Sequence, residues 1–394
     1  MNKCKAMIFP YNAESTPLVK YAPMLENFEI KALVSLKGWA MGGQDAGAAD
    51  GGDPLGISVS DDFEQALDGV DAVIVSDIGV MYHSFDNKHL EKTVLDKVLR
   101  AIEAGKTIAL LLRLTEDNRN ILREAAERNH VLFLDYSLPS PVVPESVPSS
   151  LHRIGVPVVF VAGIHECTDK FYAQLGLRDY FLKNGYRTVS IGSRSYCELL
   201  GFHSFPDFML GNNFYSNKQK ILLFNQYIFD IQNTQKPDLI VLGIPGGVMP
   251  LDPTYTSDFG TLAYMVSNAV CPDYTVLCTF YENLVDDAAF FDGLSELTSK
   301  RFGYPINAVN MSPFGIDWNI QGDTFVQYTC KDRTELQAAT VRLQKLCADL
   351  PVLNLRRAED VERLYQHITG HLSDERQVEI VNQNEFLSTG SFNA

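Results

Sequence analysis

Short apolar segments alternate with amphipathic stretches along nearly the whole chain. In the first third, the apolar segments predict strands over 5–10, 29–36, 71–77, 107–114 and 130–136. The amphipathic stretches predict helices over 88–104 and 116–128. Strands rich in Val, Ile and Leu with helices between them are typical of a parallel sheet that is covered on both faces. The pattern therefore predicts a Rossmann-like domain over residues 1–136.

The segment SLPSPVVPESVPSS, residues 137–150, interrupts this alternation. It holds four prolines and five serines in fourteen residues. Proline removes a backbone donor and fixes φ, so the segment cannot form a helix or a central strand. We expect a semi-rigid linker between two domains.

The alternation restarts after the linker and predicts a second domain over residues 151–372. The expected strands are 156–163, 186–192, 237–247 with its glycine turn, 274–280, 306–312, 325–330 and 351–355. The expected helices are 169–184, 217–232, 257–269, 284–302, 333–348 and 357–370. The predicted fold class is thus α/β, with two doubly wound parallel-sheet domains. Residues 373–394 are polar and are expected to form a loosely attached tail.

Composition narrows the choice of partners. The formal net charge of −16 over 394 residues argues against binding to nucleic acid or to an anionic membrane surface. No apolar run approaches about 18 residues, and the first residues do not resemble a secretory signal, so we expect a cytoplasmic protein. The seven cysteines form no CxxC pair, which favours reduced thiols and no metal site.

The segment GIHECTDK, residues 163–170, joins a predicted strand to a predicted helix. In a phosphate-binding loop, backbone N–H groups at a helix N-terminus face the phosphate, glycines permit the turn and a lysine neutralises charge. Gly163 and Lys170 hold the outer positions of such a loop. Asp169 stands before the lysine, where such loops have glycine, and Phe171 stands where they have the Ser or Thr that holds Mg²⁺.

Several interpretations of this loop stay open from the residues alone. One interpretation is a loop that binds an anion. The other is an ordinary strand–loop–helix connection whose lysine is exposed to solvent. Asp169 is expected to cap the helix, because Asp is a favoured N-cap residue, and a carboxylate there would repel a phosphate. The trio His165, Glu166 and Cys167 offers a metal site or a Cys–His pair, or is simply a loop with one buried thiol.

The stretches GIHECTDKFYAQLGLRDYFLKNGYRT and PDLIVLGIPGGVMPLDPTYT together resemble dethiobiotin-synthetase-like P-loop proteins. The likeness covers about 156–280 and implies that the second domain is P-loop NTPase-like. It also implies that Lys170 and the backbone of Gly246 and Gly247 hold an anion such as ATP or another nucleotide. The chain departs from that family at Phe171 and at Gly243, where the family has two Mg²⁺ ligands, so the predicted loop is degenerate.

The order of the two domains is similar to that of the DUF1611 family. A resemblance to a clostridial family encoded beside radical-SAM enzymes extends over most of the chain. It rests on FPYN (9–12) and on LVSLKGWAMGGQDAGAADGG (33–52). That resemblance implies a role in maturing ribosomally made peptides, with a radical-SAM maturase or a precursor peptide as partner.

Ligands of open α/β sheets bind beyond the carboxyl ends of the strands. This rule gathers residues 163–170, 193–195, 246–247 and 282–283 around one predicted crevice, with residues 317–318 at an edge. The candidate anion- or nucleotide-binding residues are Gly163, His165, Glu166, Cys167, Thr168, Lys170, Arg194, Gly246 and Gly247. For Arg194, a surface ion pair is the alternative interpretation.

A second candidate surface is the glycine-rich loop of the first domain. KGWAMGGQDAGAADGG has six glycines and Met41 as its one bulky aliphatic residue, so it cannot pack as core. Its polar and aromatic side chains are Lys37, Asp45, Asp50 and Trp39, and Trp39 is expected to stack on a planar ligand. A flexible connection is the alternative.

The leading hypothesis is an accessory protein of peptide maturation that binds a peptide, a partner enzyme or a small anion without hydrolysing nucleotide. The first alternative is a ligase or transferase that uses ATP or an acyl cofactor clamped by Lys170 and the glycine pair. The second alternative is a structural subunit of a complex. No catalytic residue is predicted, and a homo-oligomer stays open.

Overall fold

The computed structural model divides the chain into two compact units. The first unit comprises residues 1–141, 192–205 and 316–333, and the second comprises 142–191, 206–315 and 334–394. The structure describes residues 3–78, 87–138, 142, 144, 146–194, 196–211, 214–250, 253, 256–281, 288–316, 328–347 and 349–373. Parts of the predicted linker and the predicted tail from residue 374 onward lie outside the described residues.

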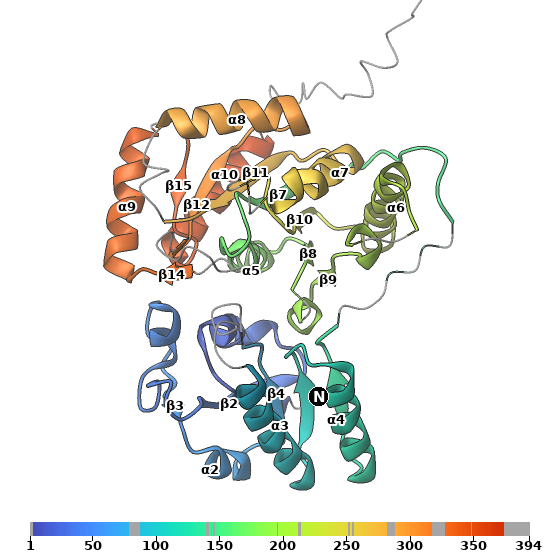
Figure 1. Ribbon diagram of the computed structural model, residues 1–394. Helices are drawn as coiled ribbons and strands as arrows, with labels where there is room; N and C mark the ends of the chain where they lie inside the picture. The colour runs from blue at the N-terminus through green and yellow to red at the C-terminus, as the bar shows by residue number, and fades with distance from the viewer. Residues whose placement is uncertain are drawn as a thin grey trace, which may run out of the picture. The chain divides into compact units, whose positions relative to one another are not determined.

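The first unit contains a parallel sheet with the strand order β3-β2-β1-β4-β5-β6 (Figure 1). This is the strand order of the Rossmann fold, in which the direction of winding reverses between β1 and β4. The strands are β1 (Cys4–Phe9), β2 (Phe28–Val34), β3 (Val59–Ser60), β4 (Ala72–Val75), β5 (Thr107–Leu110) and β6 (Phe133–Asp135).

The helices of the first unit are α1 (Thr16–Lys20), α2 (Phe63–Asp68), α3 (Asn87–Glu103) and α4 (Glu116–Arg128). Apolar residues of α2, α3 and α4 share one buried cluster with side chains of β1, β4 and β5. Val98 of α3 and Leu122 of α4 are fully buried in it. The apolar runs of the strands thus form a continuous core, as their sequence predicts.

The second unit also contains a parallel sheet, in which strands run in the order β15-β12-β11-β7-β10-β8. These strands are β7 (Val158–Gly163), β8 (Thr188–Gly192), β10 (Leu239–Gly243), β11 (Tyr274–Thr279), β12 (Ala308–Met311) and β15 (Val352–Leu353). Shorter strands are β13 (Phe314–Ile316), where the second unit meets the range assigned to the first, and β9 (His203–Ser204) and β14 (Tyr328–Cys330), which fall in the residue ranges of the first unit. β7 lies between β10 and β11, so the loop that follows it is at the centre of the sheet's carboxyl edge.

The helices of the second unit pack on its sheet. They are α5 (Lys170–Lys183), α6 (Asn217–Gln235), α7 (Thr261–Ala269), α8 (Ala288–Phe302), α9 (Arg333–Leu346) and α10 (Ala358–Ser373). α5 and α10 bury their apolar faces in one cluster with β7, β10 and β11. Phe181 of α5 and Leu364 of α10 are examples, each at most 1% exposed. The α/β class with two parallel-sheet units is therefore confirmed.

One predicted helix begins later than expected. The sequence predicts a helix over 257–269, but α7 begins at Thr261. Ser257, Asp258 and Phe259 have φ of 48°, 49° and 53°, and Gly260 has φ of 71°. Four successive left-handed residues cannot continue a right-handed helix. The pattern of apolar and polar side chains does not reveal this left-handed segment, because only the backbone dihedral angles change.

Some elements are too short for their sequence pattern to predict them. β3 has two residues, α1 has five and α2 has six, and none of these was predicted. Their apolar residues are buried by contact with longer neighbours rather than by a periodic pattern of their own. Among the described residues, no helix is both long and apolar enough to cross a membrane.

Candidate functional site

The loop between β7 and α5 has no room for a side chain at its first position. A Cβ on Gly163 would lie 2.5 Å from Thr168 Oγ1, 2.7 Å from the His165 carbonyl oxygen and 2.8 Å from Lys170 Cδ. The start of the loop is anchored to the sheet, since Ile164 N donates to the Cys278 carbonyl of β11 at 2.9 Å. Gly163 is therefore required by close packing of the loop on itself.

The loop contains two residues with left-handed backbone. Cys167 and Asp169 have positive φ of 58° and 63°, while Thr168 between them does not. Such alternation turns successive N–H groups toward one side and makes a concave nest for anions. The Thr168 hydroxyl donates to the His165 carbonyl at 3.0 Å and braces this turn.

The glycine pair after β10 packs against the same loop. Gly246 has φ of 78°, and a Cβ on Gly247 would lie 2.6 Å from the Ile164 carbonyl oxygen and 2.8 Å from Ser257 Oγ. Val248 N donates to the Gly163 carbonyl at 3.0 Å. The structure thus brings Gly246 and Gly247 together with the residues between Gly163 and Lys170, as the sequence predicts for an anion cradle.

The ammonium group of Lys170 is satisfied by the protein itself. It donates to the carbonyl of His165 at 3.1 Å and to the carbonyl of Gly246, and it lies 3.4 Å from Glu166 Oε2. A lysine ammonium has three donors, and these are three acceptors of the described chain. The Lys170 side chain is only 10% exposed. The interpretation of a solvated surface lysine is therefore wrong.

Glu166 connects the loop to the glycine pair. Its Oε1 accepts the backbone N–H of Gly246 at 2.7 Å, while Oε2 faces Lys170. A negative charge at this point also offsets the positive partial charge at the N-terminus of α5. The Glu166 carboxylate thus accepts hydrogen bonds from both the Gly246 N–H and the Lys170 ammonium group.

Asp169 does not cap α5 with its side chain, contrary to the sequence-based expectation. It occupies the N-cap position, but its carboxylate accepts from Arg356 Nε at 2.7 Å and from Nη2 at 3.1 Å. Both side chains are about one-tenth exposed, at 9% and 11%. The Arg356 guanidinium therefore offsets the repulsion expected between Asp169 and a phosphate. The sequence pattern does not indicate that Arg356 lies at this site.

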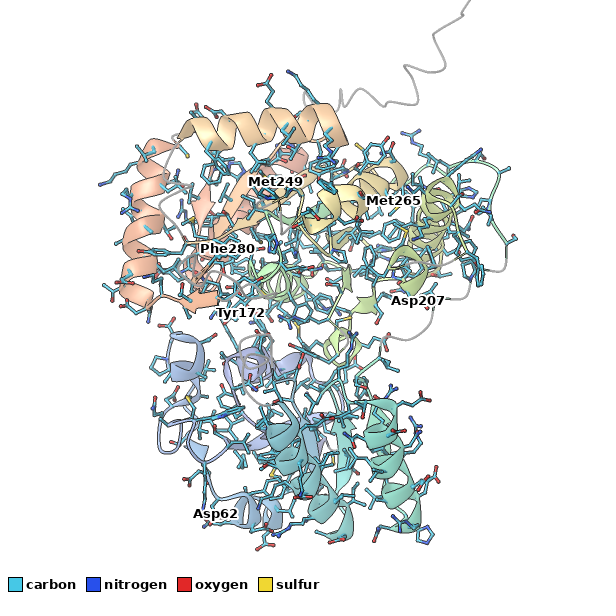
Figure 2. All side chains as sticks on the ribbon, viewed as in Figure 1. Asp62, Tyr172, Asp207, Met249, Met265 and Phe280 are labelled. Carbon is cyan, nitrogen blue, oxygen red and sulfur yellow. The ribbon has the colours of Figure 1, made fainter. Side chains whose placement is uncertain are left out.

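Aromatic rings hold the guanidinium of Arg356 in place. It lies 4.7 Å from the ring centre of Tyr172 and 5.6 Å from that of Phe314. Figure 2 labels Tyr172, which lies in the first turn of α5. Cation–π contact with two rings adds to the bidentate pair.

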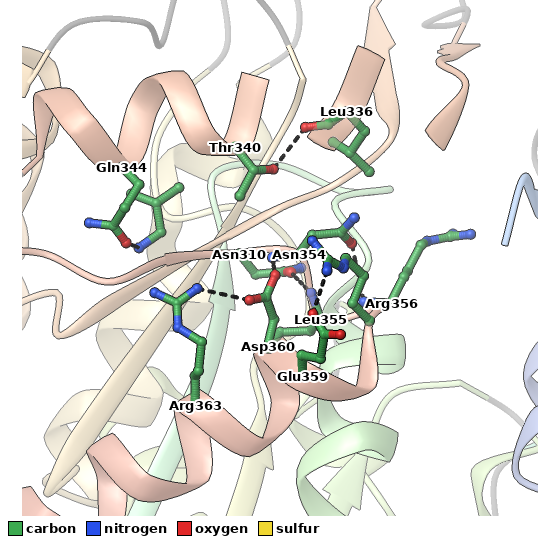
Figure 3. A network of polar contacts seen from close by, with 12 residues as sticks. Asn310, Leu336, Thr340, Gln344, Asn354, Leu355, Arg356, Glu359, Asp360 and Arg363 are labelled. Atoms are coloured by element: carbon green, nitrogen blue, oxygen red, sulfur yellow. Dashed lines mark hydrogen bonds and ion pairs between the residues drawn. The ribbon is translucent and has the colours of Figure 1, made fainter. Parts of the chain in front are cut away.

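A polar network fixes the turn that carries Arg356 (Figure 3). Asn310 at the end of β12 accepts the N–H of Leu355 at 2.9 Å. Asp360 accepts the N–H of Asn354 at 2.9 Å, and Asn354 Oδ1 accepts the N–H of Arg356 at 3.2 Å. Arg356 lies three residues after the end of β15, on the carboxyl edge of the sheet. The rule that selected Arg194 also applies to this position.

The positions of the two expected Mg²⁺ ligands do not fit a metal ion. Phe171 offers no oxygen. At Gly243 a Cβ would lie 2.2 Å from Gln174 Oε1, because the Gln174 side chain fills that space. Gln174 is buried and donates from Nε2 to the Ile191 carbonyl at 2.7 Å. Mg²⁺ requires oxygen ligands in near-octahedral geometry, and the described residues contain no group of three or more His, Cys, Asp or Glu able to hold a metal.

The remaining residues of the loop are placed as follows. His165 is buried, and its ring centre lies 6.1 Å from that of Phe280. Cys167 is half-buried. Next to the loop, Cys278 of β11 is fully buried. Burial raises its pKa to about 12, partly offset by a hydrogen bond from Asn310. That thiol is therefore neutral at physiological pH.

Arg194 belongs to the first unit, where it forms an ion pair. Its Nη2 lies 2.8 Å from Glu14 Oε2. The hydroxyl of the neighbouring Tyr196 donates to the Glu14 carbonyl at 3.3 Å. The ion-pair interpretation of Arg194 is the one that the structure shows. Ser195 and the candidates at 282–283 and 317–318 lie outside the described residues.

In the glycine-rich loop of the first unit, the predicted ligand group Asp45 binds the loop's own backbone. Its carboxylate accepts the N–H groups of Gly47, Leu55 and Gly56 at 2.8, 2.7 and 2.8 Å. These bonds, that from Leu55 foremost, hold the pKa of Asp45 below its ordinary value. Asp50 similarly accepts the N–H of Gly52 at 3.0 Å.

Trp39 packs against the core cluster of the first unit rather than standing free to stack on a ligand, and Lys37 is exposed. The FPYN motif holds this loop. The Tyr11 hydroxyl donates to the Ala46 carbonyl at 2.9 Å, and Asn12 Nδ2 donates to the Pro10 and Asp77 carbonyls at 3.0 and 2.9 Å. The two segments that carry the clostridial resemblance are thus bonded to each other.

Among solved structures, the chain is similar to a DUF1611 family protein from Anabaena variabilis, with a TM-score of 0.56 and 13% identity. The match covers 93% of this chain and 100% of that chain. Such a likeness shows the fold, and it supports the DUF1611 part of the sequence resemblance at that level. No family model matches the chain, and no curated protein matches it.

Two further matches are weaker. The hydrogenase maturation factor HypB from Archaeoglobus fulgidus has a TM-score of 0.30 and 10% identity, covering 55% of this chain and 91% of that chain. A GTPase from Pyrococcus abyssi has a TM-score of 0.29 and 16% identity, covering 56% and 98%. At these TM-scores neither likeness supports a conclusion about this chain.

Proposed function

We propose that this protein is an accessory factor in the maturation of a ribosomally made peptide. It binds a precursor peptide, a radical-SAM partner enzyme or a small anion at the loop between β7 and α5, and it does not hydrolyse nucleotide. The peptide-maturation part rests on the sequence resemblance carried by FPYN and by residues 33–52. The absence of hydrolysis rests on Gly243 and Phe171, the two positions where Mg²⁺ ligands are expected.

The observation that carries the non-hydrolysing part is the space at the end of β10. Phosphoryl transfer depends on a metal ion that neutralises the developing charge. In this chain the Gln174 amide fills the place next to Gly243 where an acidic Mg²⁺ ligand is expected. An acid could not be added there without displacing Gln174, and Phe171 supplies no hydroxyl at the other ligand position.

A binding assay with a precursor peptide and a radical-SAM enzyme tests the peptide-maturation part of the proposal. We expect the purified full chain to bind a precursor peptide or a radical-SAM enzyme of the kind that the sequence resemblance implies, with a Kd of about 10 μM or tighter. The readout is fluorescence anisotropy for the labelled peptide and co-elution for the enzyme. Failure of the folded chain to bind either one at that concentration would contradict the proposal.

A phosphate-release assay with Mg²⁺ and ATP or GTP tests the second part. We expect the wild-type rate to equal that of the Lys170→Ala variant, because the wild type has no Mg²⁺ site to lose. A wild-type rate at least tenfold above the variant's would contradict the absence of hydrolysis.

A further inference from the structure

The cradle already holds a carboxylate that belongs to the chain. Glu166 Oε1 lies 2.7 Å from the N–H of Gly246, which is 80 residues away in sequence. Its Oε2 lies 3.4 Å from the ammonium of Lys170. These two donors, a glycine N–H and the loop lysine, are the ones that would bind an oxyanion at this loop.

Carboxylate and phosphate oxygens accept the same charge-assisted hydrogen bonds. Glu166 therefore competes directly with any oxyanion that approaches Gly246 and Lys170. The two partners differ in exposure, since the Glu166 side chain is 56% exposed whereas that of Lys170 is 10% exposed. The acid is thus at the rim of the site and can rotate away without unpacking the core, while the lysine stays in place.

We propose that Glu166 is an internal competitive ligand that closes the anion cradle, and that it must move away before an oxyanion binds. This inference rests on the proposed function, because it concerns regulation of the same site. A partner that pairs with Glu166, or one that supplies a better oxyanion, opens the cradle. The isolated protein keeps it closed.

The test is an isothermal calorimetric titration of the full chain with inorganic pyrophosphate in the absence of Mg²⁺. The Glu166→Ala variant should bind pyrophosphate about 10- to 100-fold more tightly than the wild type, as expected when one competing charge-assisted hydrogen bond is removed. The gain should disappear in the double variant Glu166→Ala with Lys170→Ala. Glu166→Gln keeps the size of the side chain, so it tests the charge alone if the alanine variant does not fold, and it should show a smaller gain.

A matched control is Asp179→Asn in α5, the helix that begins at Lys170. Asp179 and Lys183 also form an acid–lysine pair four residues apart, at 2.6 Å, but at the far end of α5. Its removal changes the net charge by the same amount and should leave pyrophosphate binding unchanged. An equal gain in this control would show a general charge effect and overturn the inference.

A folded Glu166 variant that binds pyrophosphate no more tightly than the wild type, within twofold, would also overturn it. This failure is distinct from failure of the proposed function. Phosphate release that depends on Mg²⁺ in the wild type would overturn the proposed function whatever the Glu166 variants do. An inert wild type with no gain in Glu166→Ala overturns only the closed-cradle inference.

Discussion

Asp169 and Gly243 show how single residues of the cradle differ from those of a nucleotide site. Asp169 has a left-handed backbone, which glycine adopts most easily. Its carboxylate is retained for a pair with Arg356 that joins positions 187 residues apart. At Gly243 the missing side chain leaves space that Gln174 fills. The charge of Asp169 is thus paired with Arg356, and the space beside Gly243 is filled by Gln174.

Replacing Asp169 by glycine separates backbone strain from ion pairing. Glycine relieves about 1 kcal/mol of left-handed strain, but it leaves the nearly buried Arg356 without its acid, at a cost of about 3 kcal/mol. We expect Asp169→Gly to lower the free energy of unfolding by about 2 kcal/mol, measured by urea denaturation. Adding Arg356→Met should restore most of that loss, because methionine keeps the packing on Tyr172. An Asp169→Gly protein as stable as the wild type would show that the pair contributes nothing.

Gly243→Ala tests whether Gln174 fills the former ligand position. The new methyl group meets the Gln174 amide and breaks its bond to the Ile191 carbonyl, so we expect a loss of about 1–3 kcal/mol in unfolding free energy. The double variant with Gln174→Ala should lose less than the sum of the two single changes. The control is Gly293→Ala in α8, where no atom lies within 4 Å of the added Cβ. It should stabilise the protein slightly, and equal effects at both glycines would contradict this account.

At the scale of elements, the glycine-rich loop of the first unit is ordered by acids that bind its backbone. Asp45 joins Gly47 to Leu55 and Gly56, and it is the N-cap of the short helix η3 (Ala46–Asp50). The loop lacks the backbone hydrogen bonds of a helix or sheet, and side-chain oxygens accept its N–H groups instead. A segment without bulky aliphatic residues is therefore still ordered. Its stability should therefore depend on the charge of Asp45.

The pH dependence of stability tests this role. The folded-state pKa of Asp45 lies below its ordinary value of 3.8. The carboxylate therefore contributes stability that is present above that value and is lost as the pH falls through the lower, folded-state pKa. We expect Asp45→Asn to be less stable than the wild type at pH 7, by thermal denaturation, and the difference to shrink as the pH falls below about 3.8. A difference that stays constant over this range would contradict the role of the charge.

The long elements follow directly from their sequence patterns. The apolar run that ends at Gly163 predicts a strand and the helix-like stretch after Lys170 predicts a helix, and the structure places β7 and α5 within two residues of the expected bounds. The contact of Asp169 with Arg356 could not be predicted, because it depends on the packing of β15 beside β12. The same is true of Gln174, which reads as an ordinary helix residue until the space at Gly243 is known.

At the scale of the whole molecule, two parallel-sheet units divide the chain, and the candidate cradle belongs to the second. Its described charged groups compensate one another, since Glu166 faces Lys170 and Asp169 is bound to Arg356. With a formal net charge of −16, the chain as a whole does not attract free polyanions. We infer that this loop has the shape of an anion cradle but lacks the groups that would hold Mg²⁺ and nucleotide.

Calorimetric titration of the wild-type chain with ATP, in the presence and absence of Mg²⁺, distinguishes such a loop from a working nucleotide site. The account predicts that added Mg²⁺ does not strengthen binding, that no Kd falls below about 100 μM, and that Lys170→Ala gives the same result as the wild type. Binding of ATP that requires Mg²⁺, is tighter than that concentration and is lost in Lys170→Ala would contradict it.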